Sequence, residues 1–149
     1  ATIRPGVTVL EPSAGEGALA LAARRLGGEV CCIEQDPHCI NALLKLGFPV
    51  TGADFLNVPA KAVMDRVLMN PPFTKGQDVA HVMHAVQFVK PGGRLVGIMS
   101  AGVKTNRAAE RFRDVVIEEM GGDFEDLPED AFLESGTGVR TVLLVVDVP

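Results

Sequence analysis

Short continuous runs of hydrophobic residues alternate with longer amphipathic segments along most of the chain. Brief apolar runs bounded by turn residues are typical of buried strands, whereas apolar residues three and four positions apart form one face of a helix. The pattern predicts strands at 7–10, 29–33, 48–51, 66–69 and 94–99, and helices at 16–26, 37–46, 78–89 and 107–120.

The last part of the sequence has a different pattern. Residues 124–132 and 139–148 predict two more strands, joined by the turn-rich segment 134–138 with no helix between them. Strands without a crossover helix pair antiparallel. We therefore expect an α/β fold: a seven-stranded, mostly parallel sheet with helices on both faces and a C-terminal antiparallel hairpin at one edge.

Composition and charge limit the class of protein. A chain of 149 residues that is 47% hydrophobic fits a single domain spanning 1–149. The net charge of −5 argues against tight, free-standing binding to nucleic acid, which needs phosphate-neutralising Lys and Arg, although a local basic face remains compatible with it. No apolar stretch is long enough to span a membrane.

The cysteines predict a reduced, cytoplasmic protein. Cys31 and Cys32 lie inside an apolar run and are expected to be small core residues. Together with Cys39 they make an odd number with no Cys-x-x-Cys pair, which gives neither a disulfide framework nor a metal site.

A glycine-containing loop separates the first predicted strand from the first helix. Gly15 and Gly17 allow a sharp turn and a close approach of backbone to a ligand, which in such sheets lies at the carboxyl ends of the strands. Gly15, Gly17 and Ala20 also satisfy the dinucleotide fingerprint, so the loop alone leaves an NAD-dependent oxidoreductase open. The residues of this loop expected to bind a cofactor are Glu11, Pro12, Ser13, Ala14, Gly15 and Gly17.

Acidic residues follow the first two predicted strands. Glu11 would repel a pyrophosphate but suits a cationic amino acid group. Glu34 can accept hydrogen bonds from both hydroxyls of a ribose, and Gln35 can contact an adenine. Asp36 fits either an adenine contact or the N-cap of a helix beginning at Pro37.

The tetrapeptide Asn70-Pro71-Pro72-Phe73 ends the predicted fourth strand. Two consecutive prolines cannot continue a central strand, so the chain leaves the sheet here with stiff carbonyl groups facing the cleft. Asn before the prolines, Phe after them and the fourth-strand position form a combination that a plain strand end does not require.

Together these motifs resemble class I S-adenosylmethionine-dependent methyltransferases. The glycine loop matches their ExxxGxG signature at Glu11, Gly15 and Gly17. The tetrapeptide is similar to that of methyltransferases that modify an amino nitrogen. Within that group, the chain is most similar to the small phage- and plasmid-type DNA adenine-N6 enzymes. The resemblance covers nearly the whole chain. It implies a Rossmann-like class I methyltransferase fold and S-adenosylmethionine as cofactor. It also implies that Asp54 binds the adenine amino group, with Phe55 packing on the adenine or filling the core.

The resemblance implies a catalytic role for Asn70, Pro71, Pro72 and Phe73, with Asn70 also adjoining the cofactor. The Asn70 side-chain oxygen and the Pro71 carbonyl would accept the hydrogens of an exocyclic amino group, and Phe73 would stack on a flipped base. Adenine N6 in DNA is the expected acceptor. Guanine N2 in RNA, glutamine in a protein and a non-catalytic cofactor-binding subunit remain alternatives.

Flanking segments add less specific expectations. Residues 74–78 suggest a mobile loop over the target base, with Lys75 an ordinary solvated lysine, and His81 and His84 suggest satisfied or solvated side chains rather than metal ligands. The basic residues Lys104, Arg107, Arg111 and Arg113 fit a phosphate-contacting rim or a solvated helix face equally well. No target-recognition segment is visible, so a missing segment or a partner chain is expected to supply it.

Overall fold

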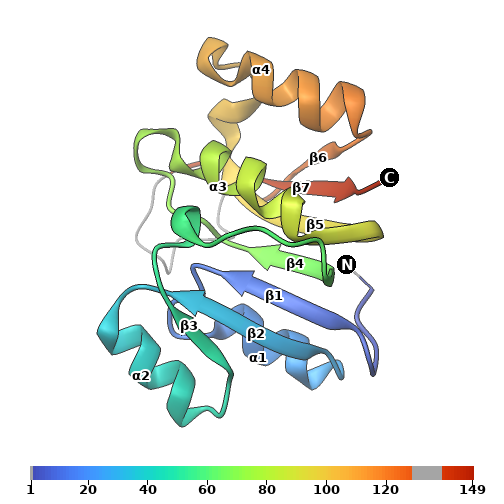
Figure 1. Cartoon of the computed structure of the whole chain (residues 1–149). Coiled ribbons are helices and arrows are strands. Elements are labelled where there is room, and N and C mark those ends of the chain that lie inside the picture. Colours follow the sequence, from blue (N-terminus) through green and yellow to red (C-terminus); the bar gives the residue numbers. More distant parts are fainter. Residues whose placement is uncertain (1, 129–138) are drawn as a thin grey trace.

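A single seven-stranded sheet organises the computed structural model, which describes residues 2–128 and 139–149 (Figure 1). Its strand order is β3-β2-β1-β4-β5-β7-β6. The first five strands pair parallel, and β7 runs antiparallel to both β5 and β6, as expected. The strands are β1 Thr8–Pro12, β2 Glu29–Glu34, β3 Val50–Gly52, β4 Met64–Met69, β5 Val89–Ser100, β6 Asp123–Asp126 and β7 Thr141–Asp147.

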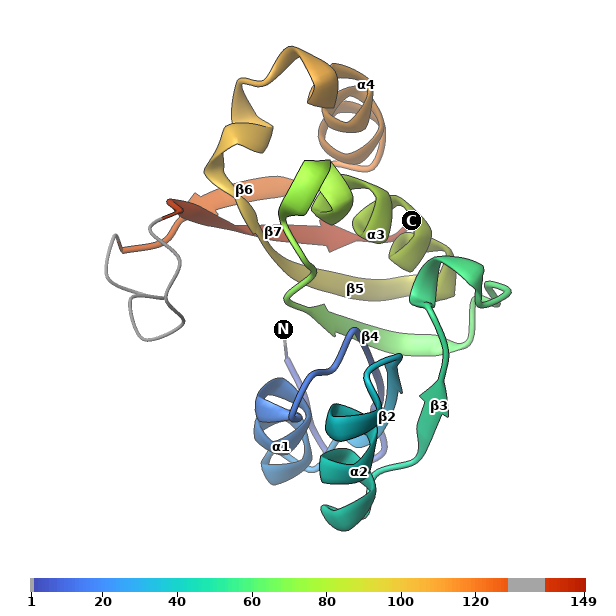
Figure 2. The same cartoon turned by 90° about the vertical axis from the view of Figure 1, so that its left-hand side faces the viewer.

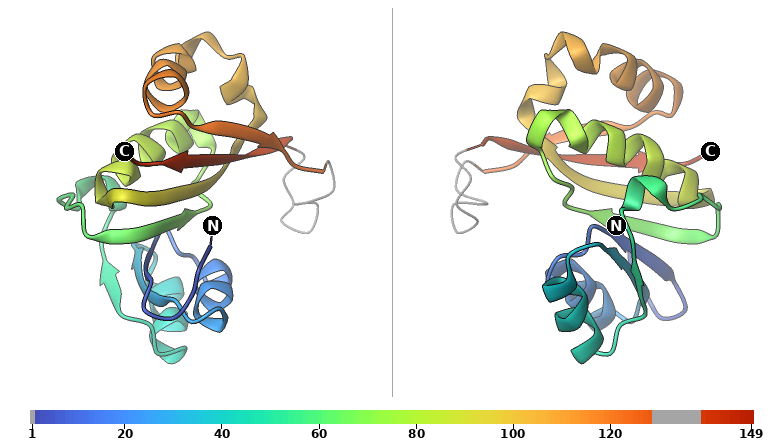
Figure 3. Two further views of the ribbon diagram at one scale, coloured as in Figure 1. Left: turned by 90° about the vertical axis from the view of Figure 1, so that its right-hand side faces the viewer. Right: turned by 60° about the vertical axis from the view of Figure 1, so that its left-hand side comes forward.

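Helices cover both faces of this sheet. Figures 2 and 3 show α1 and α2 beside β1 and β2, and α3 and α4 beside the strands of the other half. No helix in the described part of the chain has the length and apolar character needed to span a membrane. The α-helices are α1 Ala18–Arg25, α2 Pro37–Lys45, α3 Gln77–Ala85 and α4 Glu110–Arg113, and a π-helical segment, Asp114–Glu119, continues α4.

The continuous apolar runs arise because neighbouring residues of a central strand enter different cores. Val9 and Cys32 pack with α1 and α2, whereas Leu10 and Ile33 pack with α3 on the opposite face. A parallel strand covered by helices on both sides must be hydrophobic at consecutive positions. Cys32 is buried, as expected, and Cys31 is half-buried with a free thiol.

Several element boundaries differ from the expected ones. The first helix begins at Ala18 rather than at residue 16, because Gly15 and Gly17 adopt φ angles of 55° and 87°, which lie outside the helical region. Strand β5 begins at Val89 rather than at residue 94, and its first part contains an irregularity where the register against β4 shifts. Of the strand expected at 124–132, residues 129–132 lie outside the described residues, as does the turn at 134–138.

Candidate functional site

The loop after β1 makes a tight turn at the carboxyl end of the sheet. Ser13 adopts a left-handed φ of 58°, unusual for a residue with a Cβ. The Ala14 amide donates to the Ile33 carbonyl at 3.1 Å, which joins the loop to the end of β2. Gly17 allows close packing with α2, since a Cβ at this position would lie 2.7 Å from Leu43 Cδ2. The glycines of the motif therefore serve the shape of the loop.

Glu34 is the polar centre of this region. Its carboxylate is buried and accepts hydrogen bonds from the Gly15 amide at 2.7 Å, the Gln35 amide at 2.8 Å and the Asp36 amide at 2.9 Å. Asp36 itself accepts from the Cys39 amide at 3.0 Å, which identifies it as the N-cap of α2. Of the two readings of Asp36, the structure supports the helix cap.

The turn after β3 carries the next acidic side chain. Asp54 is exposed, and its Oδ1 accepts from the Leu56 amide at 3.1 Å, which fixes the carboxylate at the start of a 3-10 turn, Phe55–Asn57. Phe55 is only 2% exposed, and its ring packs against the rings of His81, His84 and Phe88. Phe55 is thus mainly a core residue.

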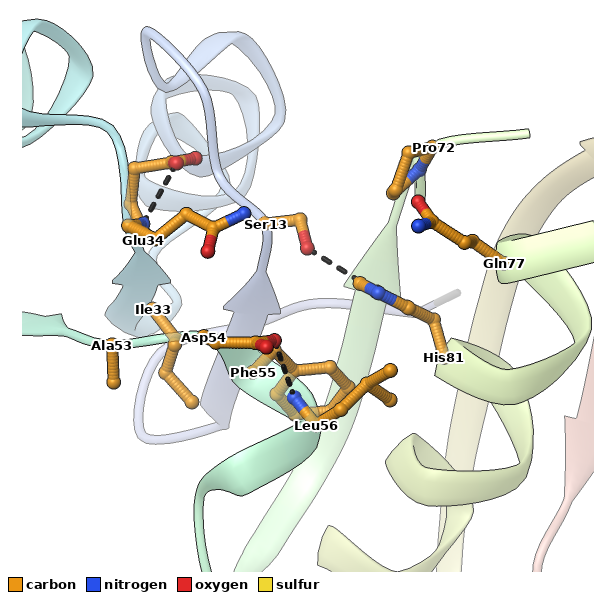
Figure 4. A pocket seen from close by; sticks show the side chains of 11 residues that line it. Ser13, Ile33, Glu34, Ala53, Asp54, Phe55, Leu56, Pro72, Gln77 and His81 are labelled. Carbon is orange, nitrogen blue, oxygen red and sulfur yellow. Dashed lines mark hydrogen bonds between the residues drawn. The ribbon is translucent and has the colours of Figure 1, made fainter. Parts of the chain in front are cut away.

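A cavity of about 250 Å³ lies where these segments meet (Figure 4). It brings together the residues expected after β2 and β3 but only Ser13 of the loop after β1, and it adds residues from the segment after β4 and from α3. The other loop residues expected to bind the cofactor do not line it: Glu11, Pro12, Ala14, Gly15 and Gly17. Its lining residues are Ser13, Ile33, Glu34, Gln35, Ala53, Asp54, Phe55, Leu56, Pro72, Gln77 and His81.

Glu11 lies outside this set. Its side chain is 4% exposed, and its Oε2 atom has no hydrogen-bond partner within the described part of the chain. Burial raises the pKa of this carboxyl to about 8; a hydrogen bond from the backbone of Ala20 in α1 opposes the shift, and the negative charge of Glu34 adds to it. Glu11 is therefore a buried acid next to the loop, not a wall of the cavity.

The tetrapeptide follows β4 directly. Asn70 is exposed, Pro71 is buried, Pro72 is exposed and Phe73 is half-buried. Pro72 lines the cavity described above, whereas Phe73 lines a second cavity of about 330 Å³. Asn70 is not among the lining residues of either. The second cavity is lined by Phe73, Lys75, Gly76, Asp78, Val79, Ser100, Gly102, Val103, Asn106, Ala108 and Ala109.

The loop expected at 74–78 ends earlier than predicted, because α3 begins one residue before its expected start at 78. Residues Thr74–Gly76 form a 3-10 turn, and α3 begins at Gln77. Asp78 is buried, and its carboxylate accepts from the Val79 amide at 3.0 Å and from the Ser100 amide at 3.1 Å. This bridge from α3 to the end of β5 orders the segment.

Sequence reasoning missed two cavity residues on α3. Gln77 and His81 are four positions apart, so they share one helix face, and both line the first cavity. His81 is 6% exposed, and burial lowers its pKa. His84 has the ordinary role expected of it, because its Nε2 donates to the Val58 carbonyl at 2.9 Å. The helix was predicted to begin at residue 78, so Gln77 lay outside it and no sequence signal joined the two residues.

The basic stretch after β5 divides into two groups. The Lys104 ammonium pairs with Asp126 at 3.0 Å, and Arg113 donates to the carbonyls of Val103 and Asn106 at 2.8 Å. These two cations are therefore committed to intramolecular contacts. Arg107 and Arg111 are exposed.

Comparison with known proteins identifies the fold. Neither a protein-family model nor a curated protein matches the sequence. The methyltransferase subunit of a type I restriction-modification system from Streptococcus thermophilus superimposes with a TM-score of 0.82 at 21% identity, over 98% of this chain and 40% of that one. TYW2 from P. horikoshii, solved in complex with MeSAdo, gives a TM-score of 0.68 at 23% identity, over 99% of this chain and 58% of that one.

A third relative acts on a different kind of molecule. Geranyl diphosphate C-methyltransferase from Streptomyces coelicolor, solved with Mg²⁺, geranyl diphosphate and S-adenosyl-L-homocysteine, gives a TM-score of 0.67 at 16% identity, over 99% of this chain and 74% of that one. The chain thus has the Rossmann-like fold of S-adenosylmethionine-dependent methyltransferases, and it spans about half the length of the first two relatives.

Proposed function

We propose that this chain binds S-adenosylmethionine in the first cavity and transfers its methyl group to an exocyclic amino nitrogen, with adenine N6 in DNA as the substrate class to test first. The observation that carries the proposal is the position of the tetrapeptide. The adjacent residues Pro72 and Phe73 line different cavities, so this turn stands between two ligand-sized spaces. A group transfer between two bound molecules requires such a place.

The first cavity fits the proposed cofactor. The Glu34 carboxylate can accept ribose hydroxyls, and the exposed Asp54 carboxylate can accept an adenine amino group. The unpartnered Oε2 of Glu11 adds a buried acceptor beside the loop, suited to a positively charged ligand group. The two acids of the lining, Glu34 and Asp54, disfavour the pyrophosphate of NAD by charge repulsion, which supports S-adenosylmethionine over a dinucleotide.

The tetrapeptide supplies groups suited to an amino acceptor. S-adenosylmethionine provides an electrophilic methyl carbon, whose bond to sulfur breaks as the bond to nitrogen forms. The Asn70 side-chain oxygen and the Pro71 carbonyl would accept the two amino hydrogens and so turn the nitrogen lone pair toward the methyl group. The nitrogen then loses a proton to solvent. A strong general base is unnecessary, because this proton leaves after the attack.

Features around the second cavity support a nucleobase as the acceptor. Phe73 offers an aromatic face for stacking, and Lys75 lines the same space. Arg107 and Arg111 are exposed next to the lining residues Asn106, Ala108 and Ala109, and could contact phosphates on either side of a flipped base. The high TM-score to a restriction-modification methyltransferase subunit makes DNA the first polymer to test.

Target recognition is proposed to come from elsewhere. The net charge of −5 is unfavourable for holding a polyanion with this domain alone. The similar restriction-modification subunit is more than twice as long as the stretch this chain matches. A segment outside this sequence or a partner chain would then supply the DNA contacts that select a site.

The test is a labelling experiment with separate pools of acceptor. The protein is incubated with methyl-labelled S-adenosylmethionine and with DNA, RNA or protein, and the labelled product is identified after digestion. Label in N6-methyladenine of DNA is the expected result. Label confined to RNA or protein would overturn the DNA assignment. Cofactor binding without label in any pool would favour a non-catalytic subunit.

A variant pair then tests the role of the tetrapeptide. Asn70→Ala is expected to lose at least about 100-fold in kcat, because the amino group is no longer oriented, while S-adenosylhomocysteine binds as in the wild type. Asn41→Ala is the matched control, since Asn41 is an exposed residue on α2. Near-normal methyl transfer by Asn70→Ala would exclude the mechanism.

A further inference from the structure

Ser13 and His81 meet across the first cavity. The Ser13 Oγ atom lies 3.3 Å from Nδ1 of His81, and Figure 4 shows the two side chains pointing toward each other. Ser13 belongs to the loop after β1 and His81 to α3, 68 residues apart in sequence. Both line the cavity. This contact therefore joins a wall of the cavity formed by the loop to a wall formed by the helix.

The contact holds a backbone conformation that would otherwise be unfavourable. Ser13 adopts a φ of 58°, which costs a residue with a Cβ about 1 kcal/mol. Ser13 directly precedes the turn in which Gly15 donates to Glu34. A change in the orientation of Ser13 would thus move the loop relative to the carboxylate proposed to hold the ribose.

His81 also contacts the turn after β3. Its ring centroid lies 5.6 Å from that of Phe55, beside Asp54, where the adenine is proposed to bind. One imidazole thus contacts both the loop and the turn after β3. We propose that His81 is a positioning residue for the cofactor: acting through the Ser13 hydroxyl, it sets the distance between the loop and the turn after β3. The inference rests on the proposed function, because it assumes that this cavity binds S-adenosylmethionine.

His84 provides a control on the same helix. Its ring packs against Phe55 with centroids 4.8 Å apart, and its Nε2 donates to the Val58 carbonyl. It is not among the lining residues of the cavity. His84→Ala is therefore expected to lower the thermal midpoint, because the bond to Val58 is lost, and to weaken S-adenosylhomocysteine binding less than His81→Ala does.

The experiment measures S-adenosylhomocysteine affinity by calorimetry on the folded protein. Ser13→Ala and His81→Ala are each expected to weaken binding about 5- to 10-fold, the effect of losing one hydrogen bond. Because the two residues act through one contact, the double variant should bind no more weakly than His81→Ala alone. Turnover with saturating cofactor should stay near the wild-type value, so that KM for the cofactor rises while kcat is unchanged.

A conservative pair separates positioning from packing. In His81→Asn the side-chain amide group lies three bonds from Cα, as Nδ1 of histidine does, so it can still form a hydrogen bond with Ser13. In His81→Gln the amide group lies one bond farther from Cα, as Nε2 of histidine does, so it is not expected to reach Ser13 in the same way. We expect His81→Asn to recover most of the affinity and His81→Gln to resemble His81→Ala. Wild-type-like binding by Ser13→Ala and His81→Ala, or effects that add in the double variant, would overturn this inference alone. Failure of the wild type to bind S-adenosylhomocysteine would overturn the proposed function as well.

Discussion

The Gly15 amide donates to the Glu34 carboxylate at 2.7 Å, and together with the bond from the Ala14 amide to the Ile33 carbonyl it ties the loop after β1 to the end of β2. The same carboxylate accepts from the Gln35 and Asp36 amides at the start of α2. Glu34 therefore organises two turns at once. A ribose bound here would share a carboxylate that the backbone already holds in place, so the site is ordered before the ligand arrives.

Replacement of Glu34 by Gln should disturb both turns. The Gln amide nitrogen cannot accept a hydrogen bond, so at least one partly buried backbone amide loses its partner, at a cost of about 1 kcal/mol in the free energy of unfolding. S-adenosylhomocysteine affinity should fall at least about 10-fold, because the remaining oxygen cannot serve both ribose hydroxyls. Urea denaturation and calorimetry measure the two effects, and unchanged affinity would remove Glu34 from the proposed site.

The two glycines of the loop should respond differently to alanine. Both have positive φ angles, but a Cβ at Gly15 meets nothing within 4 Å, whereas one at Gly17 lies 2.7 Å from Leu43 Cδ2. Gly15→Ala should cost about 1 kcal/mol of stability from the backbone alone. Gly17→Ala should cost about 1–3 kcal/mol more, because the fully buried Leu43 side chain must repack. Equal thermal midpoints for the two variants would contradict this packing.

The parts of the fold predictable from sequence were those set by local chemistry. Val9 and Leu10 belong to a continuous apolar run, which occurs because both faces of the strand are covered, and the Pro71-Pro72 pair marks the end of β4. The start of α1 was wrong by two residues, since the φ angles of Gly15 and Gly17 are set by contacts with segments distant in sequence.

The candidate site was predictable only where residues follow strands. Glu34 and Asp54 could be placed, because the carboxyl ends of neighbouring parallel strands meet at one edge. His81 could not, since it reaches the cavity from a helix and its partner Ser13 is distant in sequence. Nor does the sequence indicate that the Asp78 carboxylate would accept from the Ser100 amide and so join the start of α3 to the end of β5.

Glu11 should make stability depend on pH in an unusual direction. Its pKa is about 8 in the folded protein, against 4.5 for the free group, so between these values the folded state holds a proton that the unfolded state has lost. Stability should therefore fall as pH rises from about 4.5 to 8, by a few kcal/mol in total. Glu11→Gln should abolish this loss of stability. The variant should have the same free energy of unfolding as the wild type near pH 5 and a higher one near pH 8.5.

The same variant should bind S-adenosylhomocysteine more weakly, since an amide cannot take on the negative charge that would pair with the positive group of the ligand. Urea denaturation at several pH values provides the stability measurement. If Glu11→Gln keeps the wild-type pH dependence, the carboxyl is not the buried proton-binding group.

Asp65 should have the opposite dependence at the amino-terminal end of the sheet. Its carboxylate accepts hydrogen bonds from the Thr8 hydroxyl, the Thr8 amide and the Lys90 ammonium. These bonds lower the pKa of Asp65 to about 2, and the bond from the Thr8 hydroxyl has the largest effect. The stabilisation is present above pH 3.8, the value of the free group, and is lost as pH falls through 2. Because the side chain is one-third exposed, Asp65→Asn should cost only about 1 kcal/mol at pH 7.

This cost should disappear near pH 2, where the carboxyl is protonated in the wild type as well. S-adenosylhomocysteine affinity at pH 7 should be unchanged, because Asp65 lies at the opposite end of the strands from the cavity. A stability difference that is the same at both pH values would show that the charge of Asp65 is not what matters.

The role of Phe73 in binding the acceptor can be tested separately from cofactor binding. It lines the second cavity without lining the first, so its replacement should affect the acceptor and spare the cofactor. Phe73→Ala should raise KM for the acceptor about 10- to 100-fold through loss of stacking, while S-adenosylhomocysteine affinity stays constant. Phe73→Leu is the control, since it keeps an apolar side chain but has no aromatic face. If the leucine variant restores the wild-type KM, the second cavity recognises apolar volume, and a planar base loses its main support as the acceptor.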